Sequence, residues 1–109
     1  MIFESADPDF FIAHADINLI QQLPEAGPEK PTALSDFHQM MEQFRTMSKV
    51  TIGKVEGRAR GVGSELLLAL DMRFAALGKA CFSQPEVAAG IIPGGGGSTR
   101  LKSFSVVMT

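Results

Sequence analysis

Two glutamates in the second half of the chain are the side chains best suited to acid–base chemistry. Glu65 follows the loop Gly61-Val62-Gly63-Ser64 and opens an apolar run that ends near Leu70. A loop leading into a helix presents free backbone N–H groups at the positive end of the helix dipole, where an anion or oxyanion is stabilised. Glu86 stands between Pro85 and a Val-Ala-Ala stretch, so it is a second candidate acid or base. The alternatives are a Glu65 that only complements the dipole and a Glu86 solvated at a turn.

Three other features offer weaker chemistry. The run Gly94 to Gly97 before Ser98-Thr99 resembles a phosphate-binding loop, but Gly97 stands where that motif requires lysine, which favours a tight turn ahead of a helix. His14 and Asp16 lack a third ligand, so we expect no metal site. Cys81, between an alanine and a phenylalanine, is predicted to be a small buried hydrophobic residue.

Composition indicates one small globular domain without a polycationic surface. The 109 residues are 45% hydrophobic and 20% charged, with a net charge of −2, so neither nucleic acid nor an anionic membrane is an expected partner. There is no apolar run of about 20 residues and no basic start typical of a signal peptide. A single cysteine excludes an internal disulfide and fits a reducing compartment, so we expect a cytoplasmic protein.

The elements that must position these residues alternate between strands and helices, which indicates an α/β arrangement without a visible internal repeat. Asp16 is expected to cap a short helical turn, and Ser35 or Asp36 to cap a longer helix. That longer helix carries apolar residues at helical spacing, namely Phe37, Met40, Met41, Phe44 and Met47. The predicted strands are 10–13, 50–55, 72–75 and 80–82, the apolar helix is 65–70, and 22–34 is a polar loop.

Several segments, in register from residue 2 to 101, together resemble the crotonase (enoyl-CoA hydratase/isomerase) family. The segments that carry the resemblance are Phe11-Ile12-Ala13-His14-Ala15-Asp16-Ile17, Lys49-Val50-Thr51-Ile52 through Glu56-Gly57, Gly61-Val62-Gly63-Ser64-Glu65-Leu66, Asp71-Met72-Arg73-Phe74-Ala75, Phe82-Ser83-Gln84-Pro85-Glu86, Gly90-Ile91-Ile92-Pro93-Gly94 and Gly96-Gly97-Ser98-Thr99-Arg100-Leu101. The resemblance implies part of a crotonase-like ββα spiral fold. It also implies a core domain over residues 1–101, with an unrelated and disordered tail over 102–109.

The family's chemistry can be carried over to matching positions. Its members bind a coenzyme A thioester and stabilise the enolate with two backbone N–H groups, which by position would belong to Ala15 and Val62. Hydratase members use two glutamates for water and the α-proton, here Glu65 and Glu86, so addition of water to a 2-enoyl-CoA is the leading reaction. The matched segments also imply substrate-binding residues, namely Ala13, Asp16, Ile17, Gly61, Pro85 and Gly94. No separate cofactor is implied, because coenzyme A is part of the substrate.

The sequence departs from the family pattern in ways that leave rival readings open. His14 and Val62 replace usual glycines; both keep their N–H, but the branched Val62 side chain restricts the backbone and could crowd the acyl group. The pattern normally extends about 50 residues before Met1 and continues past Leu101 into the helices that build homotrimers or hexamers, so normal assembly is not expected here. The rivals are an isomerase, an inactive truncated remnant with an uncovered apolar helix at Leu66-Leu67-Leu68, and a nucleotide-binding module at Gly94–Thr99.

Overall fold

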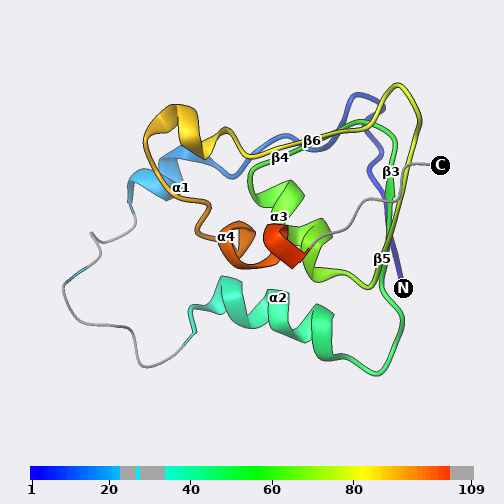
Figure 1. Ribbon diagram of the computed structural model, residues 1–109, viewed down its shortest axis with the longest axis horizontal. Helices are drawn as coiled ribbons and strands as arrows, with labels where there is room; N and C mark the ends of the chain where they lie inside the picture. Colours follow the sequence, from blue (N-terminus) through cyan, green and yellow to red (C-terminus); the bar gives the residue numbers. More distant parts are fainter. Residues whose placement is uncertain (23–26, 28–33, 104–109) are drawn as a thin grey trace.

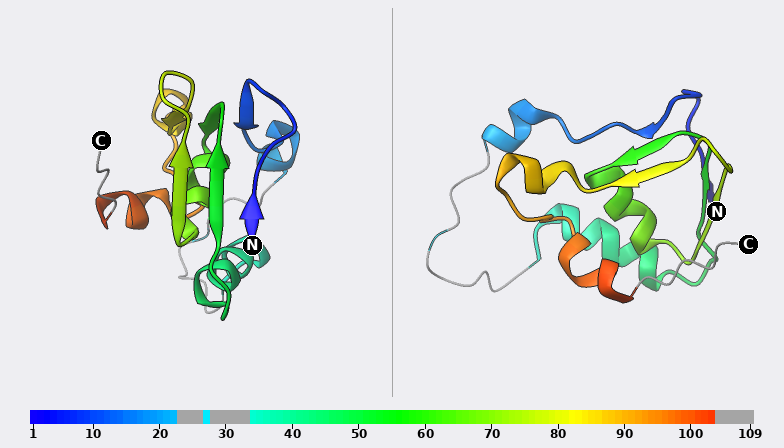
Figure 2. Two further views of the ribbon diagram at one scale, coloured as in Figure 1. Left: turned by 90° about the vertical axis from the view of Figure 1, so that its right-hand side faces the viewer. Right: turned by 45° about the horizontal axis from the view of Figure 1, so that its top comes forward.

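The strands form two parallel sheets of three strands each in the computed structural model, which describes residues 1–22, 27 and 34–103. The first sheet has the order β1 (Ile2–Phe3), β3 (Ile52–Val55), β5 (Met72–Ala75), seen side by side in Figure 2. The second has the order β2 (Phe10–Ile12), β4 (Arg58–Arg60), β6 (Cys81–Ser83). Most of the predicted loop 22–34 and residues 104–109 of the predicted tail lie outside the described residues.

The chain visits the two sheets in turn and then forms a helical segment, three times over. The helical segments that close the three turns are α1 (Ile17–Gln21), α3 (Val62–Ala69) and the 3-10 helix η1 (Pro85–Ala89). Helix α2 (Asp36–Thr46) precedes β3, and α4 (Gly97–Arg100) and η2 (Leu101–Ser103) follow the glycine run. This is the ββα spiral that the sequence predicts. The predicted boundary after Leu101 falls within η2, so the domain limits stay a prediction.

The core lies around α3, which Figure 1 shows between the two sheets and α2. Leu67 on α3 is fully buried, and it shares a core cluster with Phe11, Val55, Ala59 and Leu70. Helices α2 and α4 both pack against α3. The expectation of an uncovered apolar helix at Leu66–Leu68 is wrong for Leu67, which neighbouring elements cover, while Leu66 and Leu68 are half-buried.

Two predicted helix caps are confirmed, and one helix start is corrected. The Asp16 carboxylate accepts the N–H of Asn18 at 2.8 Å, and the Ser35 hydroxyl accepts the N–H of His38 at 3.4 Å. Helix α3 begins at Val62, three residues before the predicted start, because Gly61 itself is the N-cap, with a φ of 52° that favours glycine. The predicted loop 61–64 thus contributes most of its residues to the helix.

The second sheet also differs from the sequence-based expectation. Strand β4 was not predicted, since Arg58-Ala59-Arg60 offers only one apolar residue; Ala59 is nevertheless fully buried. Strand β6 begins one residue later than expected. Cys81 is exposed, which corrects its assignment as a buried residue, because β6 is an edge strand of the described sheet.

The starts of β3 and β5 are tied together by a side-chain clamp. Thr51 donates its N–H and its hydroxyl to Asp71 Oδ2, both at 2.8 Å, and the Asp71 N–H is donated to Thr51 Oγ1 at 2.9 Å. The Thr51 backbone N–H, followed by its hydroxyl, holds the pKa of Asp71 below its usual range, because both bonds favour the charged carboxylate. None of the helices in the described part of the chain is long and apolar enough to cross a bilayer.

Candidate active site

The Glu65 carboxylate is enclosed by the glycine run. Glu65 lies in the first turn of α3 with only 3% of its surface exposed. Its Oε1 accepts the N–H of Gly97 at 2.8 Å. A methyl group at Gly95 would overlap Oε2, and a methyl group at Gly97 would stand 3.0 Å from Oε1. Gly95 and Gly97 therefore let the main chain lie directly against this carboxylate.

The second predicted carboxylate, Glu86, faces the N-terminus of the same helix. Glu86 lies in η1, directly after β6, and its Oε1 is 3.0 Å from the position that a methyl group at Gly61 would take. Its Oε2 is buried and has no hydrogen-bond partner among the described residues. The simple alternative of a fully solvated turn residue does not describe this carboxylate.

Gln84 is a site residue that the sequence reasoning missed. Both atoms of its side-chain amide are buried without a hydrogen-bond partner within the described chain. A methyl group at Gly97 would stand 3.1 Å from Gln84 Nε2 and 3.0 Å from Glu65 Oε1, so the amide and the carboxylate face the same point. The sequence feature that could have identified Gln84 is its position two residues before the candidate Glu86.

The buried polar atoms of Gln84 and Glu86 that have no hydrogen-bond partner among the described residues indicate where a ligand or water fits. An unmade buried hydrogen bond costs about 1–3 kcal/mol, so such groups are normally partnered. Here three of them, on Gln84 and Glu86, follow one another along the same short segment after β6. The segment therefore offers both a donor and acceptors to a small polar group.

The first predicted oxyanion donor, Val62, is the first residue of α3. Backbone N–H groups in a first helical turn have no partner within the helix, and no side chain of the described residues caps this one. The N–H of Gly61 is already donated to Ser83 O at 2.9 Å, which leaves the N–H of Val62 as the first without a partner among the described residues. The dipole at this end favours developing negative charge.

The second predicted donor, Ala15, follows β2. Because β2 pairs in parallel with β4, which runs into α3, the chain beyond β2 and the start of α3 lie at the same edge of the sheet. A methyl group at Gly63 would stand 2.8 Å from Ile12 O, so the two segments approach closely. The ring of His14 donates from Nδ1 to Ala15 O at 2.6 Å. The donor roles of Ala15 and Val62 stay predictions.

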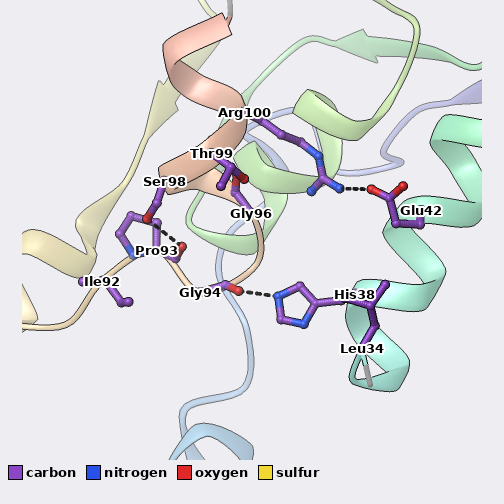
Figure 3. A pocket seen from close by; sticks show the side chains of 10 residues that line it. All are labelled: Leu34, His38, Glu42, Ile92, Pro93, Gly94, Gly96, Ser98, Thr99 and Arg100. Carbon is purple, nitrogen blue, oxygen red and sulfur yellow. Dashed lines mark hydrogen bonds and ion pairs between the residues drawn. The ribbon is translucent and has the colours of Figure 1, made fainter. Parts of the chain in front are cut away.

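The predicted substrate-binding residues fall into separate groups. Gly61 and Pro85 lie close together, since a methyl group added at Gly61 would stand 3.9 Å from Pro85. Ala13, Asp16 and Ile17 lie together after β2, where the Asp16 carboxylate is used as the cap of α1. Gly94 instead lines a cavity of about 370 Å³ between α2 and the glycine run, shown in Figure 3.

The described residues contain no group of three side chains suited to hold a metal ion. Within the glycine run, the N–H of Gly97 is donated to the Glu65 carboxylate and is therefore not open to a phosphate.

A ββα spiral of two parallel-stranded sheets around a central helix is the architecture of crotonase-fold proteins. A Streptomyces avermitilis protein assigned as an enoyl-CoA hydratase superposes with a TM-score of 0.79 and 42% identity, over 94% of this chain and 38% of that one. The sequence model of the enoyl-CoA hydratase/isomerase family matches residues 1–104. The chain belongs to that family.

Two curated relatives of this chain are much longer than the chain itself. It is 40% identical over 90 residues to the enoyl-CoA isomerase/hydratase of Mycosarcoma maydis, over 83% of this chain and 32% of the relative. It is 34% identical over 102 residues to the fatty acid oxidation complex subunit alpha of Aliivibrio fischeri, over 93% of this chain and 15% of the relative. The chain thus spans a third or less of the length of these curated relatives.

Proposed function

We propose that this chain adds water to 2-enoyl-CoA thioesters through an enolate held at the N-terminus of α3. The observation that supports it best is the placement of Glu65 and Glu86 at one helix end, one within its first turn and the other facing its N-cap. Two carboxylates are what hydration requires, since one activates water while the other supplies a proton.

In the proposed reaction, the thioester oxygen accepts hydrogen bonds from the N–H groups of Val62 and Ala15. Water attacks the β-carbon, one glutamate takes a proton from that water, and the other gives a proton to the α-carbon. The product thus gains one hydroxyl and one hydrogen, and negative charge resides on the thioester oxygen only in between. Losing one such backbone donor typically costs about 100- to 1,000-fold in rate. The unpartnered amide of Gln84 is suited to bind the water.

Isomerisation of an enoyl-CoA double bond is the second candidate, because the Mycosarcoma maydis relative is named for both activities. Moving a double bond needs one carboxylate that carries a proton between two carbons. It would therefore survive the loss of one of the two glutamates, whereas hydration needs both.

The test is an assay of crotonyl-CoA hydration by the purified chain and its isosteric variants Glu65→Gln and Glu86→Gln. We expect each variant to lose about 100- to 10,000-fold in kcat, because each removes an acid–base group without changing its shape. Glu56→Gln is the matched control, since Glu56 is exposed and pairs with Lys54 at 3.1 Å.

Activity that survives Glu86→Gln would refute its assigned role. If one variant keeps 3-enoyl-CoA isomerisation while hydration is lost, the second candidate is favoured. A wild-type chain that melts cooperatively but processes neither substrate would show it to be a non-catalytic piece of the family fold.

A further inference from the structure

His38, on the first turn of α2, is hydrogen-bonded at both ring nitrogens. Its Nε2 lies 2.6 Å from Gly94 O and its Nδ1 lies 2.7 Å from Ser35 Oγ. A carbonyl oxygen can only accept, so Nε2 carries the proton. In the neutral ring Nδ1 then accepts the Ser35 hydroxyl proton, and the Ser35 oxygen accepts the His38 N–H as the helix cap. The ring is thereby held in one orientation toward the glycine run (Figure 3).

The glycine run needs hydrogen bonds from other parts of the chain to hold one conformation. Four consecutive glycines have no side chains to pack and the greatest backbone freedom of any residues. Besides His38, a second tie comes from Arg100, which donates to Gly95 O at 3.2 Å and to Glu42 Oε1 at 2.8 Å. Both His38 and Glu42 belong to α2, so this helix holds Gly94 directly and Gly95 through Arg100. Figure 3 shows the bonds of these two side chains to Gly94 and Arg100.

The opposite side of the run contacts the proposed catalytic carboxylate. Gly97 donates its N–H to Glu65 Oε1 at 2.8 Å, and Gly95 packs directly against Oε2. A shift of Gly94 would reach both contacts through the main chain, because Gly94 precedes Gly95 directly and Gly97 follows two residues later. The position of the carboxylate therefore depends on where α2 holds the turn.

We propose that His38 is a positioning residue for Glu65, acting through its hydrogen bond to Gly94 O. This inference rests on the proposed function for its kinetic consequence, but its geometric claim is independent of activity. His38 does not itself contact the reacting atoms. It limits the conformations of the turn so that the Gly97 N–H stays directed at Glu65.

The experiment compares His38→Gln, His38→Asn and His38→Ala. The glutamine amide can take the place of Nε2 and donate to Gly94 O, whereas the shorter asparagine amide cannot reach it. Gln43→Ala is the control, since Gln43 is an exposed residue of α2. The readouts are the NMR resonance of the Gly97 amide and the kcat and KM for crotonyl-CoA hydration.

We expect His38→Ala and His38→Asn to move the Gly97 amide resonance and to lower kcat about tenfold to a hundredfold with little change in KM, because a displaced group is still present but misaligned. His38→Gln should restore both readouts, and Gln43→Ala should change neither. An unchanged Gly97 resonance in the alanine and asparagine variants would overturn the inference, as would a glutamine variant no better than asparagine.

If His38→Ala does not fold, the glutamine and asparagine variants decide the question, because both are amides and differ in reach. If the wild-type chain shows no hydration, the proposed function fails, while the Gly97 resonance still supports or overturns the role of His38.

Discussion

Replacing Gly95 by alanine tests whether the position of the Glu65 carboxylate controls the rate of the proposed reaction. The added methyl group would overlap Glu65 Oε2 and stand 2.8 Å from Cε1 of Phe37. Carbon atoms in ordinary contact are about 3.5–4.0 Å apart, so a neighbour must move by about an ångström. Gly95 has no positive φ, so alanine adds no strain to the backbone itself.

The carboxylate is the group expected to move. The main chain of Glu65 belongs to α3, which is fixed in the core, whereas the tip of a side chain can rotate away. The rotation breaks the bond from the Gly97 N–H and displaces the acid–base group. A misplacement of about an ångström costs about a hundredfold in rate. Overpacking typically costs about 1–3 kcal/mol, and the buried hydrogen bond that is lost adds a cost of similar size.

The assay is kcat for crotonyl-CoA hydration beside a urea titration of the same preparation. Gly27→Ala is the matched control, since it makes the same change where no atom of the described residues lies within 4 Å. We expect Gly95→Ala to lose most of its kcat, and its unfolding free energy to fall by about 2–4 kcal/mol because the overpacking and the broken buried hydrogen bond add. A Gly95→Ala enzyme with wild-type kcat would refute the argument, as would a large loss of stability at unchanged kcat.

Three further predictions do not depend on activity. The folded pKa of Asp71 lies below its unfolded value of about 3.9, so the stabilisation by Thr51 is complete above that pH and is lost as the pH falls through the folded pKa; Asp71→Asn should flatten this fall in thermal melts at acid pH. Leu67→Ala should cost about 2–5 kcal/mol in urea unfolding because Leu67 is fully buried. Leu77→Ala, at a side chain that is 96% exposed, should stay within about 0.5 kcal/mol. Cys81 should react with a thiol reagent in the native protein, because it is exposed.

Each of these has a contradicting result. If the melting temperatures of the wild type and Asp71→Asn fall equally at acid pH, the Thr51–Asp71 clamp does not control the loss of stability there. Equal costs at Leu67 and Leu77 would contradict the placement of α3 in the core. A Cys81 thiol that reacts only in denaturant would contradict its position on an exposed edge strand.

Local sequence signals were sufficient for most elements of the fold. Asp16 and Ser35 mark helix starts through side-chain oxygens that bind nearby backbone N–H groups, an interaction that needs no distant partner. Runs such as Met72–Ala75 show their strand character in the same local way. Strand β4 escaped detection because its evidence is a single alanine, whose burial depends on elements far along the chain.

The candidate site also contains residues that local sequence signals identified and contacts that they did not. Spacing and resemblance pointed to Glu65 and Glu86, because the chemistry requires those residue types at a helix start and after a strand. Neither the burial of the Gln84 amide nor the contact of Gly97 with Glu65 follows from spacing, since 32 residues separate that pair.

By itself, the sequence indicated the family, the two glutamates proposed as the acid–base pair, and the concentration of glycine in the second half of the chain. Tertiary structure decided which glycines touch which carboxylate, which helix holds the glycine run, and that Cys81 is exposed while Leu67 is covered. The physical reason is that caps and periodicity act within a few residues, whereas burial and the orientation of a carboxylate are set by groups brought together when the two sheets and their helices pack.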